Sequence, residues 1–142
     1  MVNSLLNAVT TQLGTKFGDG YYYYVENVEQ KLMKPCFTVD ALMPTMRSRS
    51  PKLYDRTVPI VIHYFSDSKN GLKNDCYEMA ERLLEYLEYI PYEKTMLRGE
   101  DISWQITGDV LQVFVTYRFM TGMSAVTEDT MEEILDTVTK TQ

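Results

Sequence analysis

Histidine and cysteine are scarce in this sequence. Its 142 residues include one histidine, His63, and two cysteines, Cys36 and Cys76. Two cysteines are too few for a disulfide framework and neither lies in a Cys-x-x-Cys motif, so we expect free thiols and a reducing compartment. A zinc site needs three or four ligands at short spacing, and these three side chains are scattered. We therefore expect neither a metal site nor a cofactor.

Phosphate-binding and membrane-spanning patterns are missing as well. The sequence has no Gly-x-Gly-x-x-Gly and no Gly-x-x-x-x-Gly-Lys, the glycine-rich patterns that cradle phosphates. No apolar run approaches the roughly 18 residues that span a bilayer. The first residues, Met1-Val2-Asn3-Ser4, lack the basic and apolar regions of a signal peptide. These observations predict a soluble protein that is cytoplasmic at synthesis.

Positive charge is in the minority. The chain has 14 lysines and arginines against 20 aspartates and glutamates, a formal net charge of −6. Generic nucleic-acid binding needs a basic face that displaces counterions, so the overall charge argues against it, although one local basic patch remains compatible. The 44% hydrophobic and 24% charged content is that of a globular domain and excludes disorder of the whole chain.

Hydrophobic periodicity predicts an α+β fold. Apolar spacing of three or four residues indicates helices, and alternation indicates strands. The expected helices are 2–17 and 74–90, and the expected strands are 21–25, 36–43, 58–65, 94–98, 102–107 and 110–120. This gives a mixed, mainly antiparallel sheet of about five to six strands packed by two helices, in the order α-β-β-β-α-β-β-(β). We expect one domain over 1–123 and an acidic C-terminal arm over 124–142, as a short amphipathic helix or an extended arm.

The strongest strand and the strongest helix each have one apolar face. Strand 110–120 alternates apolar side chains that include Val113, Val115 and Tyr117. Helix 74–90 carries an apolar stripe that includes Leu83, Leu84 and Leu87. We predict that these two faces pack together and form the centre of the core.

Residues 44–57 are a basic segment in an acidic chain. Its prolines and serines favour an exposed loop. It contains four cations and one acid, namely Arg47, Arg49, Lys52 and Arg56 against Asp55. One interpretation is a solvated turn. The other is contact with an acidic surface, either a neighbouring subunit or nucleic acid passing nearby. Acids gather at 78–101 and 128–136, so the loop of one copy could meet the acidic face of another, an arrangement that suits a closed ring.

Catalysis is not indicated by any local pattern. A Cys36–His63 nucleophilic pair is an alternative, because such pairs meet in space rather than in sequence. Buried cysteine is the commoner case, and a lone histidine in a strand is usually a packed residue. We expect no catalytic residue and keep a small Cys/His enzyme as the less favoured interpretation.

Several segments in a fixed order resemble a known family. They are Val28-Glu29-Gln30, Pro35-Cys36-Phe37, Ile60-Val61-Ile62-His63-Tyr64-Phe65, Ala80-Glu81-Arg82-Leu83-Leu84, Arg98-Gly99, Gly108-Asp109-Val110-Leu111 and Tyr117-Arg118-Phe119. Together they resemble the small tail terminator (tail completion) proteins of tailed phages, prophages and phage-tail-like particles. The resemblance covers about residues 3–120, and Met131-Glu132-Glu133 is similar to acidic endings in this family.

The resemblance implies a structural role in assembly. Such proteins form a hexameric ring on the head-proximal end of the finished tail tube, where the ring ends tube polymerisation and offers a docking face to neck proteins. In contractile tails the ring also meets the sheath. DNA at most passes through the lumen, no membrane is involved, and the location is the host cytoplasm during assembly and then the virion or particle. A different head–tail connector or neck component is the alternative.

Overall fold

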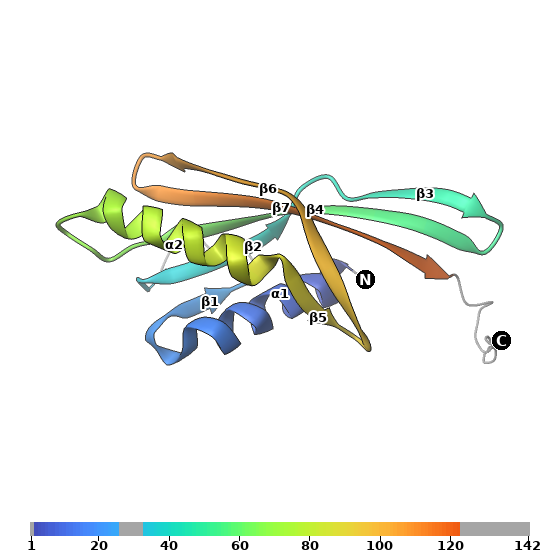
Figure 1. The fold of residues 1–142 in the computed structure, drawn as a ribbon, viewed down its shortest axis with the longest axis horizontal. Helices are drawn as coiled ribbons and strands as arrows, with labels where there is room; N and C mark the ends of the chain where they lie inside the picture. The colour runs from blue at the N-terminus through green and yellow to red at the C-terminus, as the bar shows by residue number, and fades with distance from the viewer. Residues whose placement is uncertain (1, 26–32, 123–142) are drawn as a thin grey trace. The chain divides into compact units, whose positions relative to one another are not determined.

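The computed structural model describes residues 2–25 and 33–122 (Figure 1). The predicted arm at 124–142 and the motifs Val28-Glu29-Gln30 and Met131-Glu132-Glu133 lie outside the described residues. The described chain forms two compact units. The larger unit contains 2–44 and 57–118, and the smaller unit contains 45–56 and 119–122. The single domain expected over 1–123 stays a prediction.

Two α-helices belong to the larger unit. Helix α1 spans Val2–Phe17, as the periodicity predicts, and a short 3-10 turn, η1, follows at Gly18–Gly20. Helix α2 spans Leu72–Leu87, so it begins and ends earlier than the predicted 74–90. Its N-cap is Gly71, whose φ of 71° is a left-handed conformation that glycine adopts without strain. The helix therefore starts after a left-handed glycine, two residues before the predicted start.

The strands form one seven-stranded sheet. Their order is β1-β2-β4-β7-β6-β5, with β3 paired to β4. The bounds are Tyr22–Tyr24 for β1, Cys36–Ala41 for β2, Thr45–Ser50 for β3, Leu53–Phe65 for β4, Tyr89–Tyr92 for β5, Thr95–Thr107 for β6 and Val110–Gly122 for β7. The β1–β2 pair is parallel, whereas β2–β4, β5–β6 and β6–β7 are antiparallel. The predicted α+β class with a mixed, mainly antiparallel sheet is confirmed.

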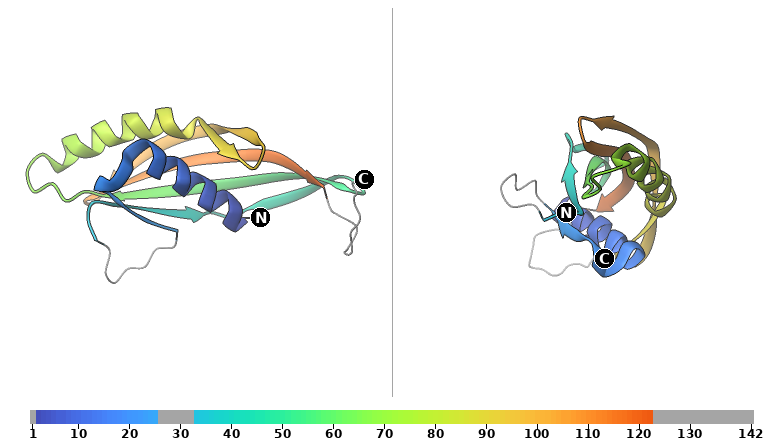
Figure 2. Two further views of the ribbon diagram at one scale, coloured as in Figure 1. Left: turned by 90° about the horizontal axis from the view of Figure 1, so that it is seen from below. Right: turned by 90° about the vertical axis from the view of Figure 1, so that its left-hand side faces the viewer.

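Both helices lie against the same face of the sheet in the larger unit (Figure 2). The ring centroid of Phe37 in β2 lies 5.1 Å from that of Phe17 in α1, and equally far from that of Tyr64 in β4. Tyr64 in turn donates a 2.8 Å hydrogen bond to the carboxylate of Asp75, in the first turn of α2. Aromatic packing and one partly buried hydrogen bond thus join the sheet to both helices.

Helix α2 packs on β7, as the apolar stripes predict. Val113, Val115 and Tyr117 are buried, and the Tyr117 hydroxyl donates a 2.7 Å hydrogen bond to the Leu87 carbonyl at the end of α2. Leu83 is fully buried, whereas Leu84 is half-buried. The predicted stripe is therefore correct in position but is centred on Leu83 rather than on Leu84.

The chain between α2 and β7 differs from the predicted elements. Residues 89–92 form the edge strand β5 where the helix was expected to continue to residue 90. The predicted strands 94–98 and 102–107 are one strand, β6, with an irregular register between Glu100 and Ser103 and a φ of 54° at Asp101. A two-residue turn, Gly108-Asp109, joins β6 to β7, because Thr107 pairs with Val110, and Gly108 has a φ of 63°.

Candidate assembly surface

The basic segment is a β-hairpin rather than the loop expected over 44–57. Strand β3 pairs with β4, and the turn between them lies at residues 51–52. Pro44 precedes β3 and Pro51 lies in the turn, so neither proline interrupts the paired strand. The expectation failed because pairing with β4 supplies hydrogen bonds that local composition does not reveal. We call residues 45–56 the basic hairpin.

Nothing in the described part of the chain covers strand β3 on either face. Its residues from Thr45 to Arg49 are all exposed, and successive side chains of a strand point to opposite faces. Among the described strands β4 is its one pairing partner, so β3 also has a free edge. The smaller unit further exposes the apolar side chains of Met46, Leu53 and Met120. Free edges and exposed apolar side chains are features of surfaces that contact another chain.

The four predicted cations all lie on this hairpin, and two of them are engaged within the smaller unit. Arg49 forms a 3.3 Å ion pair with Asp55, and Arg56 donates a 3.2 Å hydrogen bond to the Thr121 hydroxyl on β7. Arg47 and Lys52 make no ion pair or side-chain hydrogen bond with any described residue. Four cations against Asp55 give the hairpin a formal charge of +3, two charges of which are free to meet a partner.

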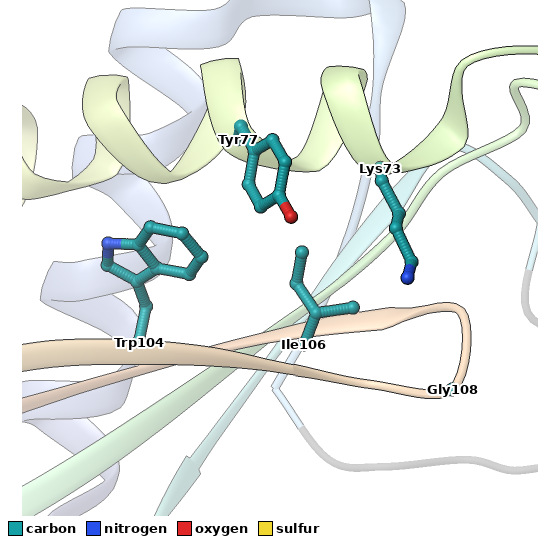
Figure 3. Close-up of a pocket in the computed structure, with 5 residues that line it drawn as sticks. All are labelled: Lys73, Tyr77, Trp104, Ile106 and Gly108. Atoms are coloured by element: carbon teal, nitrogen blue, oxygen red, sulfur yellow. The ribbon is translucent and has the colours of Figure 1, made fainter.

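A groove between α2 and β6 was not predicted from the sequence. Lys73 and Tyr77 of α2 line it together with Trp104, Ile106 and the turn residue Gly108, and it encloses about 570 Å³ (Figure 3). The rings of Tyr77 and Trp104 lie 5.8 Å apart at an angle of 57°. The sequence held one hint of this groove, its single tryptophan. Trp104 lies on the apolar side of the predicted strand 102–107, in which apolar and polar residues alternate. The groove offers two aromatic rings and one ammonium group, which suits contact with a partner.

Cys36 and His63 lie near each other on the sheet. Cys36 pairs with Phe65 and Thr38 pairs with His63, so the two residues are diagonal neighbours on β2 and β4. The His63 ring contacts the Gln112 side chain at 3.2 Å through Nε2, and its Nδ1 has no partner among the described residues. Burial raises the pKa of the Cys36 thiol, although nearby Lys34 opposes the shift. Burial also lowers the pKa of His63, against the effect of Asp40.

These shifts work against a nucleophilic pair. A reactive cysteine needs a depressed pKa so that the thiolate forms near neutral pH. Cys36 has the opposite shift and is fully buried. In the described ranges, no three His, Cys, Asp or Glu side chains are grouped to hold a metal ion. None of the described helices is long and apolar enough to cross a membrane.

Comparisons with known proteins identify the family. No curated protein matches the chain. Eighteen chains of solved structures match it. One of them has 11% sequence identity and a TM-score of 0.42 over 87% of this chain and 96% of that chain, a likeness too weak to support a functional statement. A family model described as phage tail terminator protein matches residues 4–133, most of the sequence. The chain therefore belongs to the phage tail terminator protein family and has a structural role in a phage tail.

Proposed function

We propose that copies of this chain form a ring, expected to be hexameric, on the head-proximal end of the tail tube. The ring ends the addition of tube subunits and joins the tail to neck proteins. In a contractile tail it also contacts the sheath. The chain is then made in the host cytoplasm and incorporated into the virion or into a phage-tail-like particle. Family membership supports the tail role, and the basic hairpin supports the contact between copies.

The observation that carries the proposal is a charged strand, β3, that no residue of 2–25 or 33–122 covers on either face. An isolated monomer gains nothing from exposing β3, its free edge and three apolar side chains together. A partner would cover them. Helix α2 of the same chain, together with its C-cap residue Glu88, exposes a row of carboxylates that also includes Glu78, Glu81 and Glu85. A hairpin of one copy meeting the acidic helix of the next is a head-to-tail contact, and such contacts generate rings when the rotation closes.

The hairpin is proposed to face the ring lumen or to cross a subunit boundary. Arg47 and Lys52 are the residues that we expect to make the contact, because Arg49 and Arg56 already have partners in the smaller unit. Arg49 and Arg56 position the hairpin instead. In the lumen, the same cations would lie beside DNA that passes through the ring.

Two alternatives lead to different partners. A head–tail connector or neck component would bind the portal or an adaptor protein rather than the tube. A small Cys/His enzyme would need a reactive thiol, which the burial of Cys36 disfavours. Co-purification with tube protein supports the proposal, whereas exclusive binding to a portal or adaptor favours the connector.

The hairpin contact is tested by reversing the two free charges. Arg47→Glu with Lys52→Glu should weaken ring formation and tube attachment, because two charges reverse in sign, a net change of four units, opposite an acidic neighbour. The effect should be largest at low salt, where screening is least. The measurement is the oligomer distribution by native mass spectrometry, together with occupancy of tube ends in electron micrographs.

The matched control is Lys69→Glu with Lys94→Glu. Both lysines are exposed and lie outside the hairpin, so this variant changes the net charge equally. Rings that form normally in the hairpin variant, or that are weakened equally in the control, would show that the hairpin makes no specific contact.

A further inference from the structure

The C-terminal residues of the chain complement the basic hairpin in charge. Residues 123–142 contain five carboxylates and one lysine, a formal charge of −4, against +3 on the hairpin. The acids are Glu128, Asp129, Glu132, Glu133 and Asp136. The same segment contains four apolar residues, Met131, Ile134, Leu135 and Val138. The smaller unit exposes apolar side chains as well, those of Met46, Leu53 and Met120.

The point at which this segment begins is beside the hairpin turn. Strand β7 ends at Gly122, and a Cβ placed on Gly122 would lie 3.6 Å from the Lys52 carbonyl oxygen. The Thr121 hydroxyl also accepts the hydrogen bond from Arg56. A segment tethered next to its binding surface has an effective concentration on the order of millimolar, so weak individual contacts can still hold it.

We propose that, in the free subunit, residues 124–142 fold back over the basic hairpin of their own chain. Their carboxylates meet Arg47 and Lys52, and their apolar side chains cover the exposed side chains of the smaller unit. Exposed ion pairs are individually weak, so the contact depends on several charges and on the tether. The segment protects a cationic strand that has a free edge and no other cover in the described chain.

The inference concerns the free subunit and does not depend on ring formation. In a ring, an acidic neighbour would compete with the segment for the same two cations. Measurements on the dilute, monomeric protein therefore separate this inference from the proposed assembly, and either can fail without the other.

Zero-length crosslinking of the full chain tests which groups meet. A carbodiimide joins carboxylates to the amine of Lys52, the one lysine of the hairpin. The reaction is run on an equal mixture of ¹⁴N- and ¹⁵N-labelled protein, so that crosslinks between chains are recognised as mixed-isotope pairs. We expect crosslinks from Lys52 to residues 128–136 within single chains, and a several-fold loss between about 0.01 M and about 1 M salt, as the Debye length falls from about 30 Å to about 3 Å. Arg47→Gln should lower the yield, whereas the exposed Lys69 should give few such crosslinks.

Hydrogen exchange tests whether the segment protects β3, which crosslinking does not show, because two groups can lie close together without protecting the strand. In the full chain, Glu128→Gln, Glu132→Gln and Glu133→Gln together should speed amide exchange in β3 several-fold while leaving β7 residues 110–118 unchanged. The matched control is Glu78→Gln, Glu81→Gln and Glu85→Gln on α2. Unchanged exchange in β3, equal acceleration by the control, or Lys52 crosslinks confined to mixed-isotope pairs would overturn the proposal.

Discussion

Gly99 is the residue at which α2 and β7 leave no room for a side chain. A Cβ at this position would lie 2.5 Å from the Leu87 carbonyl oxygen and 2.7 Å from the Val115 side chain. The Gly99 amide also donates a 2.6 Å hydrogen bond to the Glu88 carbonyl. The close approach involves backbone, which cannot move aside as the end of a flexible side chain can.

Gly99→Ala should therefore destabilise the larger unit by about 1–3 kcal/mol, the usual cost of overpacking. The measurement is urea unfolding followed by circular dichroism. Gly14→Ala is the control, because nothing lies within 4 Å of a Cβ there and alanine favours helix α1. Equal stability of Gly99→Ala and the natural chain would mean that α2 does not sit this close to the sheet.

The two thiols make stability depend on pH in a defined direction. Burial raises the pKa of Cys36, and burial together with the carboxylates of Asp75 and Asp109 raises that of Cys76. A folded pKa above the unfolded value, which is about 8.5, stabilises the protein fully at lower pH. The stabilisation is lost as the pH rises from there through the folded pKa values.

We expect the free energy of unfolding to fall between about pH 8.5 and 10, below the range in which tyrosines titrate. The Cys36→Ala, Cys76→Ala variant should be less stable at neutral pH and flatter across this window. Denaturant unfolding at a series of pH values gives both curves. Parallel curves for the two proteins would contradict the expected thiol linkage.

At the scale of elements, the sequence predicts helices and strands correctly where one face of the element is buried. Helix α1 and the alternating burial of Leu111, Val113, Val115 and Tyr117 on β7 follow from apolar spacing alone. Strand β3 has no buried face, so its sequence carries no alternation, and Pro44 and Pro51 at its ends imitate a loop. Its cations were predicted as the candidate site, but their hairpin geometry depends on pairing with β4. The groove at Trp104 was missed because it forms only where α2 crosses β6.

Helix α2 gives a direct comparison of two adjacent leucines. Leu83→Ala should cost about 2–5 kcal/mol, because Leu83 is fully buried against the sheet. Leu84→Ala should cost clearly less, because that side chain is half-exposed. Chemical denaturation of the two variants measures the difference. A larger loss for Leu84→Ala would mean that the helix is rotated about its axis relative to this structure.

At the scale of the whole molecule, the distribution of charge is the feature on which the proposed assembly depends. A chain of net charge −6 concentrates four of its 14 cations in the basic hairpin, and the described residues leave strand β3 of that hairpin exposed. Exposed carboxylates line α2, so each copy presents both signs of charge to its neighbours. Complementary charges of this kind select partners and register more than they add affinity.

If this chain ends the growth of a tail tube, as proposed, its presence should set the length of tubes assembled with it. Tube protein should be polymerised with and without the purified chain and imaged by cryo-electron microscopy. We expect shorter tubes that carry ring-shaped density at one end only. Tubes of unchanged length with bare ends, formed in the presence of folded protein, would contradict it.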